Sequence, residues 1–325
     1  MSVAIADVNS DNKSDIVVAN QGSNTVSVLL NTGNGAFNAP INYTVGGGPF
    51  SVAVVDVNSD NKPDIVVANY NSSTVGVLLN TGSGTFYAQN TYPVGRGPQA
   101  VAVVDVNSDN KPDIIVANGG SNNIGVLFNA GNGTFNAQTN YSVSTNPQSV
   151  AVADVNSDNK PDIIVANYGS SNIGVLLNIG SGTFNPQTTY AAMYAPYSVA
   201  VADVNSDNRL DIVVANYGNS VGVLLNAGNG TFTAQTVYYV DIYPYSVAVV
   251  DVNSDNTPDI VVANYGSNDV MVLLNTGSGT FNTGTRYIVD TAPHSVAVVD
   301  VNNDNKPDIV VASYSRNTVS VLLHC

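Results

Sequence analysis

The sequence contains no glutamate and no tryptophan, and only 10% of its 325 residues are charged. All 24 acidic residues are therefore aspartates, and with nine Lys and Arg they give a formal net charge of −15. This balance excludes nucleic acid as a partner, because a phosphate backbone requires clustered basic residues. It also disfavours an anionic membrane surface. A strongly negative chain favours a cationic partner, and a metal ion is the simplest one.

Other absences narrow the fold class. The single cysteine, Cys325, excludes a disulfide within the chain. No run of about 18 apolar residues occurs, so we expect no insertion into a membrane. No window shows helical periodicity, and glutamate, a strong helix former, is missing. The sequence therefore predicts an all-β protein.

One motif, Asp-Val-Asn-x-Asp-Asn-x-x-Asp, recurs seven times at spacings of 48 or 49 residues. Each repeat contains four stretches with strand character, and in the fourth repeat these are 149–153, 162–166, 173–177 and a weaker one over 183–191. The second stretch is continuously apolar, which is typical of a strand buried on both faces. A period of this size with four strands is typical of a propeller blade.

We therefore predict one domain, 1–325, that forms a seven-bladed β-propeller with four antiparallel strands in each blade. An open β-solenoid is the alternative architecture. The last repeat ends after its third strand, so we expect an incomplete last blade. The first repeat begins at once without a signal peptide, and we expect the chain to be part of a longer protein. The predicted blades are 1–48, 49–97, 98–146, 147–195, 196–243, 244–292 and 293–325.

The repeated motif predicts a metal loop. Of the 24 aspartates, 21 lie at positions 1, 5 and 9 of the seven loops, and position 3 is always asparagine. Oxygen donors at alternate positions resemble the first half of an EF-hand loop. Position 6 is always asparagine, which tolerates a left-handed backbone. Position 7 varies, as expected of a residue that binds only through its carbonyl oxygen.

Hard oxygen donors without nearby Cys or His favour Ca²⁺ over zinc or copper. Seven Ca²⁺ ions would supply +14 charges against the net −15. We expect up to seven structural calcium ions. The predicted ligands occupy positions 1, 3, 5, 7 and 9 of the loops: Asp7, Asn9, Asp11, Lys13, Asp15, Asp56, Asn58, Asp60, Lys62, Asp64, Asp105, Asn107, Asp109, Lys111, Asp113, Asp154, Asn156, Asp158, Lys160, Asp162, Asp203, Asn205, Asp207, Arg209, Asp211, Asp251, Asn253, Asp255, Thr257, Asp259, Asp300, Asn302, Asp304, Lys306 and Asp308. The alternative is that the loops are Asx-rich turns that need no metal.

The loops resemble those of the FG-GAP/VCBS repeat family, which includes the integrin α-chain propeller. The resemblance covers essentially the whole chain and implies a seven-bladed propeller with Ca²⁺ between the first and second strands. Two features depart from the family pattern. Phe135-Asn136 replaces the Phe-Gly pair, and Ala166-Asn167-Tyr168 replaces Gly-Ala-Pro. The chain is therefore nearer the VCBS-like branch, and integrin-type ligand binding is not implied.

Antiparallel connectivity predicts two different faces. The loops after the first and third strands lie on one face, and those after the second and fourth lie on the other. Many tyrosines and the three remaining aspartates fall on this second face, and tyrosine is favoured at recognition surfaces. The alternative is that the tyrosines pack between blades. The candidate ligand-binding residues are Tyr194, Tyr197, Tyr217, Asp241, Tyr243, Tyr245, Tyr265, Asp269, Asp290 and His294.

These features favour a monomeric extracellular or cell-surface module for adhesion or for recognition of a glycan or protein. The placement follows from calcium, because extracellular modules bind it at about 10⁻⁴–10⁻³ M. A structural spacer within a larger surface protein is one alternative. An enzyme that acts on polysaccharides is another. We expect no catalysis, because most carboxylates are assigned to metal and no nucleophile–base pair is visible.

Overall fold

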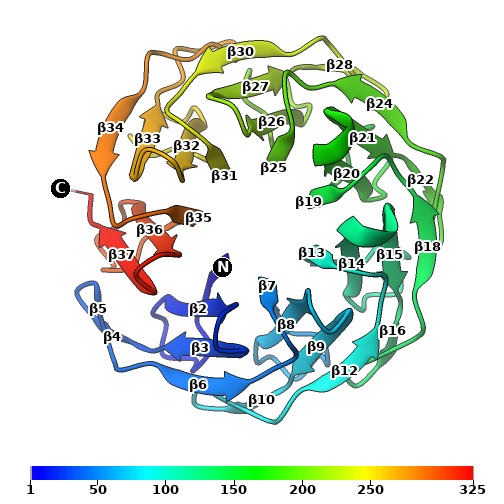
Figure 1. The fold of residues 1–325 in the computed structure, drawn as a ribbon, viewed down its shortest axis with the longest axis vertical. Coiled ribbons are helices and arrows are strands. Elements are labelled where there is room, and N and C mark those ends of the chain that lie inside the picture. Colours follow the sequence, from blue (N-terminus) through cyan, green and yellow to red (C-terminus); the bar gives the residue numbers. More distant parts are fainter. Residues whose placement is uncertain (1, 325) are drawn as a thin grey trace.

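The computed structural model describes residues 2–324 and confirms the seven-bladed propeller (Figure 1). Met1 and Cys325, which the predicted domain also includes, lie outside the described residues. Six blades are four-stranded antiparallel sheets, and the last has three strands, as predicted. In the described part of the chain, the only helices are the three-residue turns η1 (Gly119–Ser121) and η2 (Tyr168–Ser170). No helix there is long and apolar enough to cross a bilayer.

The blades, numbered 1 to 7 along the chain, share one strand order from the axis outward. The first strands are β1 (Ser2–Ala6), β7 (Pro49–Val55), β13 (Pro98–Val104), β19 (Pro147–Ala153), β25 (Pro196–Ala202), β31 (Pro244–Val250) and β35 (Pro293–Val299). The second strands are β2 (Asp15–Asn20), β8 (Asp64–Asn69), β14 (Asp113–Asn118), β20 (Asp162–Asn167), β26 (Asp211–Asn216), β32 (Asp259–Asn264) and β36 (Asp308–Ser313).

The outer half of each blade holds the remaining strands. The third strands are β3 (Thr25–Leu29), β9 (Thr74–Leu78), β15 (Asn123–Leu127), β21 (Asn172–Leu176), β27 (Ser220–Leu224), β33 (Asp269–Leu273) and β37 (Thr318–Leu322). The fourth strands are β6 (Ile41–Thr44), β12 (Asn90–Pro93), β18 (Thr139–Ser142), β24 (Thr188–Ala191), β30 (Thr236–Tyr239) and β34 (Thr285–Ile288).

The fourth strand predicted over 183–191 is in fact two elements. A small hairpin, β22 (Asn178–Gly180) with β23 (Thr183–Phe184), precedes the fourth strand proper, β24. The chain reverses tightly because Gly180 (φ 113°), Ser181 (φ 51°) and Gly182 (φ 68°) adopt positive φ. The equivalent hairpins are β4 (Asn31–Gly33) with β5 (Ala36–Phe37), β10 (Asn80–Gly82) with β11 (Thr85–Phe86), β16 (Asn129–Gly131) with β17 (Thr134–Phe135), and β28 (Asn226–Gly228) with β29 (Thr231–Phe232).

The apolar core is divided among the junctions between blades. Each of the seven buried clusters joins two neighbouring blades, as Val66 and Val77 of blade 2 meet Ile114 and Val116 of blade 3. Strands such as β20 are buried along their whole length, because both of their faces contact other blades. This confirms the interpretation of the continuous apolar run at 162–166.

Serine hydroxyls link neighbouring first strands around the axis. The Oγ of Ser295 accepts a hydrogen bond from the backbone N–H of Val3 at 3.2 Å, which joins blade 7 to blade 1. Five equivalent bonds run from Val52 to Ser2, Val101 to Ser51, Val199 to Ser149, Val247 to Ser198, and Val296 to Ser246. Ala100 carries no hydroxyl, so the chain of bonds is interrupted between blades 3 and 4.

Asparagine side chains make a second set of links. Asn31 Nδ2 of blade 1 donates to the carbonyl oxygen of Val301 of blade 7 at 2.8 Å. The equivalent asparagines 80, 129, 178, 226 and 275 each donate to the preceding blade. Val3, Ile16 and Val18 also pack against blade 7. The ring therefore closes through side-chain packing and hydrogen bonds rather than through a shared blade.

Ala100→Ser should complete the serine links by placing a hydroxyl near the N–H of Val150. We expect the free energy of unfolding to rise by about 0.5–1.5 kcal/mol, the net value of one hydrogen bond. Urea denaturation measures this, with Ser198→Ala as the matched variant that should lower stability by a similar amount. A destabilised Ala100→Ser beside a destabilised Ser198→Ala would contradict the prediction.

Candidate functional site

The seven aspartate loops join the first and second strands, and they lie on one face of the ring with the small hairpins. The two groups touch directly, since Asp15 Oδ1 accepts a hydrogen bond from Asn31 N at 2.7 Å. Within the first loop, Asp7 and Asn9 are half-buried, Asp11 is exposed, and Asp15 is fully buried at the start of β2. The predicted ligands therefore share one short loop with a graded exposure to solvent.

The loop conformation is set by Asx turns. Asp7 Oδ2 accepts the N–H of Asn12 at 2.7 Å, and its Oδ1 accepts that of Asp11 at 3.1 Å. Asn9 Oδ1 also accepts from Asp11 N at 3.0 Å. Position 6 has positive φ in every loop, which confirms the left-handed asparagine. Position 4, Ser10 in the first loop, is left-handed as well, a feature that the sequence analysis missed.

The aspartate at position 9 is a buried carboxylate. Asp64 Oδ2 accepts from Val57 N at 3.0 Å, and its Oδ1 accepts from Asn80 N at 2.8 Å. Burial raises the pKa of Asp64 to about 6, with added repulsion from Asp60 and Asp56, although the two backbone hydrogen bonds oppose the shift. Burial has the same effect on the pKa values of Asp113 and Asp162, also to about 6. The two backbone hydrogen bonds therefore do not fully offset the cost of burying a negative charge at position 9.

Whether the loops suit a metal depends on donors and on geometry. Their carboxylate, amide and carbonyl oxygens are the ligands of a hard divalent cation. Part of the charge is already matched by the residue at position 7, since Lys160 Nζ lies 3.1 Å from Asp158 Oδ2. Among residues 2–324, no group of three or more Asp, His or Cys side chains is arranged as a metal site. The donor chemistry fits Ca²⁺, and the conformation is that of Asx turns, so calcium stays a prediction.

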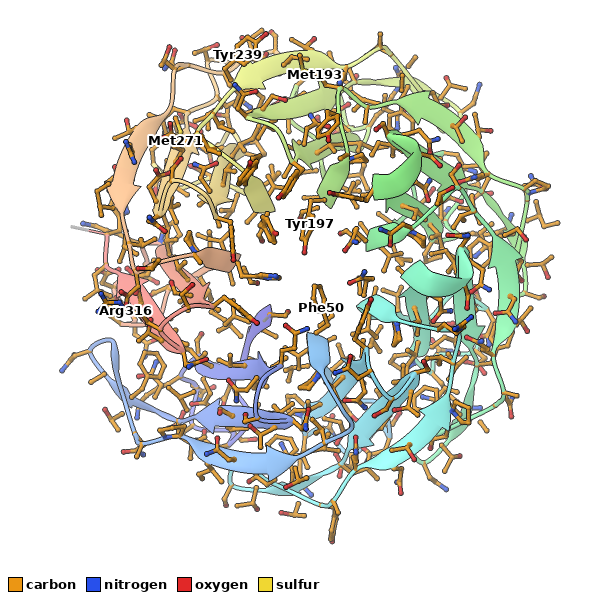
Figure 2. The ribbon with its side chains drawn as sticks, viewed as in Figure 1. Phe50, Met193, Tyr197, Tyr239, Met271 and Arg316 are labelled. Carbon is orange, nitrogen blue, oxygen red and sulfur yellow. The ribbon has the colours of Figure 1, made fainter. Side chains whose placement is uncertain are left out.

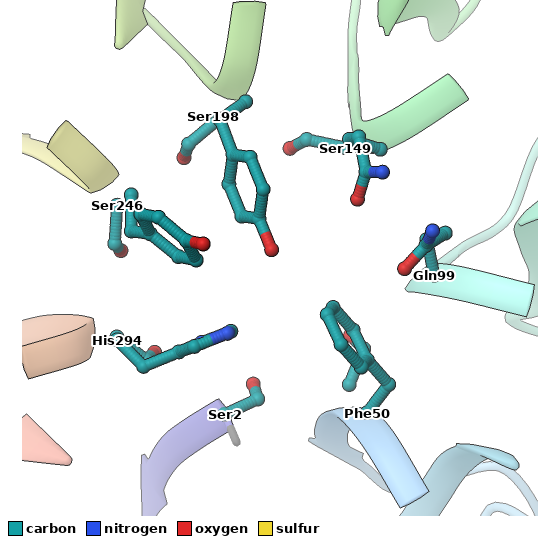
Figure 3. Close-up of a pocket in the computed structure, with 12 residues that line it drawn as sticks. Ser2, Phe50, Gln99, Ser149, Ser198, Ser246 and His294 are labelled. Carbon is teal, nitrogen blue, oxygen red and sulfur yellow. The ribbon is translucent and has the colours of Figure 1, made fainter. Parts of the chain in front are cut away.

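The opposite face bears an aromatic cluster around the axis. Tyr197, Tyr245 and His294 are each the second residue of a first strand. The sequence had suggested that Tyr197 and Tyr245 lie in the turns that precede these strands. They line a central cavity of about 100 Å³ together with Phe50, which faces Tyr197 from the other side (Figures 2 and 3). The ring centroids of Tyr197 and Tyr245 are 4.1 Å apart, and those of Tyr245 and His294 are 4.9 Å apart.

A second tier of rings extends this cluster. Tyr217 stacks on Tyr243 at 4.5 Å, and Tyr265 stacks on Tyr245 at 4.4 Å. We call the six residues Tyr197, Tyr217, Tyr243, Tyr245, Tyr265 and His294 the aromatic mouth. Tyr194, 59% exposed, lies beside it at the same face. Tyr70, Tyr168 and Tyr314 also contact these rings or Phe50.

The three aspartates outside the loops do not line the central cavity. Asp269 is fully buried, with its Oδ2 atom 2.7 Å from Arg286 Nε. Asp241 lies 3.5 Å from the same Arg286 nitrogen. Asp290 lies 3.5 Å from Arg316 Nε and accepts a hydrogen bond from Thr318. These carboxylates therefore lie outside the cavity lining and are paired with arginines.

Phe50, Gln99 and Gln148 line the cavity and were missed from sequence. A signal was present, since each follows the proline that begins a first strand, as do Tyr197, Tyr245 and His294. Aligning the repeats on that proline shows that one equivalent position in each of blades 2 to 7 lines the cavity. The residue there is aromatic or histidine in blades 2, 5, 6 and 7 and glutamine in blades 3 and 4.

A ring of seven sheets with an aspartate loop after each first strand defines the class of repeat β-propellers with acidic loops. The chain belongs to the FG-GAP-like repeat family, whose profile matches residues 7–67, 56–116, 105–165, 154–214, 203–262 and 251–311. This confirms the resemblance drawn from the loop motif. No curated protein matches the sequence.

Solved structures with the same fold are distant in sequence. BBS1N, crystallised in complex with ARL6DN, is 15% identical with a TM-score of 0.70, over 99% of this chain and 91% of that one. Streptogramin B lyase is 16% identical with a TM-score of 0.70, over 99% and 92%. A candidate 6-phosphogluconolactonase from Bacteroides fragilis is 14% identical with a TM-score of 0.71, over 97% and 92%. At these identities the likeness shows the fold alone.

Burial raises the pKa values of Tyr197 and Tyr245 well above the ordinary value, so both hydroxyls keep their protons at a pH near 10, where an exposed tyrosine loses its proton. The unfolded chain loses these protons near pH 10, before the folded chain does. We therefore expect the free energy of unfolding to fall between pH 9 and pH 11. In the double variant Tyr197→Phe, Tyr245→Phe this decrease should be smaller. Urea denaturation at the two pH values measures this. Tyr87→Phe, at a ring 64% exposed, is the control and should follow the unmodified chain.

Proposed function

We propose that the protein is a calcium-stabilised recognition module, extracellular or on the cell surface, which binds a glycan or protein ligand at the aromatic mouth. The observation that carries the proposal is the uneven distribution of rings around the axis. If aromatic residues were needed there to hold the blades together, every blade would require one. Blades 3 and 4 have Gln99 and Gln148 instead, yet their junction is buried like the others. The rings of blades 5 to 7 are therefore better explained by a ligand.

The chemistry of the aromatic mouth suits an uncharged or cationic ligand. Tyrosine offers an apolar ring face and a hydroxyl that donates or accepts hydrogen bonds. Tyr243 is 40% exposed and Tyr194 is 59% exposed, so both can contact a ligand from solvent. The net charge of −15 opposes an anionic ligand. Sugars and peptide segments combine apolar patches with hydroxyl or amide groups, and both match this surface.

Calcium would act on the opposite face as a structural ion. Side-chain oxygens at positions 1, 3, 5 and 9, with the carbonyl at position 7, would hold it. Its charge would offset the repulsion that the position 9 carboxylates feel from their neighbours. Loops fixed in this way would hold the first and second strands of each blade in register. Extracellular fluid is the setting in which weak calcium sites of this kind are filled.

We propose binding rather than catalysis. The carboxylates at positions 1 and 9 of the loops accept backbone hydrogen bonds, and Asp241, Asp269 and Asp290 are paired with arginines. None of these carboxylates lies in the lining of the central cavity, where a reacting group could meet a ligand. A spacer role, without any ligand, is the alternative that binding assays at the aromatic mouth distinguish.

Calcium should raise the melting temperature by several degrees, and excess EDTA should reverse the rise, because a ligand of the folded state stabilises it by RT ln(1 + [L]/Kd) per site. Calorimetry with and without calcium, followed by metal analysis, measures the effect and a stoichiometry near seven. Asp60→Asn weakens one loop at an exposed position and should lower the count by about one. An unchanged melting temperature with no bound calcium would identify the loops as metal-free Asx turns.

Tyr243→Ala and Tyr245→Ala should weaken binding of any glycan that the unmodified protein retains on an array. We expect a loss of roughly 2 kcal/mol each in titration calorimetry, the size typical of an aromatic anchor. Tyr87→Ala, at an exposed ring away from the aromatic mouth, is the matched control and should bind normally. Equal binding by Tyr243→Ala, Tyr245→Ala and the control would place the ligand elsewhere. No retention of any glycan would remove the glycan version and favour a protein ligand or a spacer.

A further inference from the structure

The junctions between blades repeat one aromatic contact. The phenylalanine that ends a small hairpin packs edge-on against a tyrosine in the fourth strand of the preceding blade. Phe135 and Tyr92 are an example, with ring centroids 5.5 Å apart and planes at 80°. The same contact joins Tyr43 to Phe86, Tyr141 to Phe184, Tyr190 to Phe232, and Tyr238 to Phe281. These five phenylalanines are 5–8% exposed, so each fills its junction.

The junction between blades 6 and 7 has the tyrosine without the phenylalanine. Tyr287 occupies the equivalent position in β34 and is 44% exposed, and the next residue, Ile288, is 72% exposed. A cavity of about 430 Å³ lies beside the Tyr287 ring. Its walls are largely apolar and include Val272 and Leu274 of blade 6 and Ile309 and Leu322 of blade 7. The cavity therefore corresponds to the site that a phenylalanine fills in the other junctions.

Two further positions, one in the last blade and one beside it in blade 1, lack the partner that their counterparts have. Figure 1 shows β37 at the outer rim, and within residues 2–324 no strand pairs with its outer edge. Phe37, the hairpin phenylalanine of blade 1, packs against the buried cluster between blades 7 and 1, as do Val319 and Val321 of blade 7. No tyrosine ring contacts Phe37 in the described chain, unlike its five counterparts. A single added strand on β37 would therefore supply a phenylalanine to the cavity and a tyrosine to Phe37.

We propose that this groove binds an extended segment of a partner protein with the pattern Asn-x-Gly-x-Gly-x-Phe-x₅-Tyr. The spacing of six between Phe and Tyr is the same in all six hairpin-and-strand segments of this chain, from Phe37 and Tyr43 to Phe281 and Tyr287. The segment adds a fourth strand to β37 through backbone hydrogen bonds, and its two rings give specificity. The site lies at the outer rim, away from the aromatic mouth. Its lining includes Asn253, one of the predicted calcium ligands, so the binding experiments are run at one fixed calcium concentration.

The sequence of β37 indicates which segment fits best. Residues 318–323 are identical to residues 25–30 of blade 1, Thr-Val-Ser-Val-Leu-Leu. In blade 1 the Ser27 hydroxyl donates to Asn42 Oδ1 at 2.6 Å, across to β6. Ser320 holds the same place in blade 7. The matching partner segment therefore has the chemistry of residues 31–45, with asparagine opposite this serine.

Segments from the other blades should fit less well. In blades 2 to 5, glycine replaces the serine, and a glutamine side chain lies against it. A Cβ built on Gly125 would be 2.1 Å from Gln138 Oε1. The equivalent distances are 2.0–2.2 Å at Gly76, Gly174 and Gly222. A serine at that position therefore collides with the glutamine unless the latter moves. We expect β37 to discriminate against segments that carry this glutamine.

The first experiment measures fluorescence anisotropy of a labelled peptide with the sequence of residues 31–45, titrated with the full chain. We expect saturable binding. Phe→Ala at the position of Phe37, or Tyr→Ser at that of Tyr43, should weaken it by about tenfold or more, the loss of one buried aromatic anchor. A peptide with the sequence of residues 129–143, which carries Gln138, should bind several-fold more weakly. Tyr287→Ser in the protein should reduce binding, and Tyr87→Ser, the matched exposed control, should not.

A second experiment joins the segment covalently to the end of the chain, so that its docking does not depend on the affinity of a free peptide. His324 N donates to Asp308 Oδ1 at 2.8 Å, as Asn31 N does to Asp15, so residue 324 stands where the segment would begin. A chain in which the sequence of residues 31–45 follows Leu323 should melt several degrees higher, and Phe→Ala in the added segment should abolish the gain.

Absence of both peptide binding and the rise in melting temperature overturns the proposal, as does peptide binding that ignores the loss of its phenylalanine. Light scattering measures the oligomeric state and so tests whether a second copy of the chain occupies the groove. A dimer that Tyr287→Ser dissociates would assign the groove to a second copy of the chain instead of a partner segment.

Discussion

The buried aspartate at position 9 of each loop is the interaction on which the architecture depends. In the second repeat, Asp64 accepts one hydrogen bond from Val57 in its own loop and another from Asn80 in the small hairpin. The Asn80 amide in turn donates to Val8 of the preceding blade. One carboxylate thus fixes the loop, ties it to the hairpin and orients the link between blades. Because this carboxylate is enclosed, burial raises its pKa to about 6.

This constraint separates the two faces of the ring. On the loop face, all seven repeats keep the aspartates and the left-handed asparagine, and the first six also keep the hairpin asparagine, so the sequence there is nearly invariant among repeats. The other face carries no such requirement, so residues such as Phe50, Gln99 and Tyr245 differ at equivalent positions. The aromatic rings accordingly collect at the axis on the face that is free to vary. The rigid face serves as the frame that positions it.

The sequence was sufficient for the fold because the period, the loops and the apolar second strands are all local signals. It could not tell which tyrosines line the axis and which pack between blades. Tyr190 contacts Phe232, and Tyr197 faces the cavity, although they lie seven residues apart in one connection. Nor could it foresee that Arg286 would neutralise Asp269, since their contact depends on the register of β33 and β34. Which side chains face the axis and which ions pair depends on how distant segments pack, and this packing cannot be predicted from a single sequence.

The distribution of links also locates the weakest junction. The two ends of the described chain meet between blades 7 and 1, yet that junction keeps the Asn31 bond to Val301, the serine bond from Val3 and an apolar cluster. The junction between blades 6 and 7 has the serine bond but neither a hairpin phenylalanine nor an asparagine, because residue 324 is histidine. Local opening is easiest where buried contacts are fewest. Within residues 2–324, the ring is therefore most accessible to an incoming strand at the junction between blades 6 and 7, beside the free edge of β37.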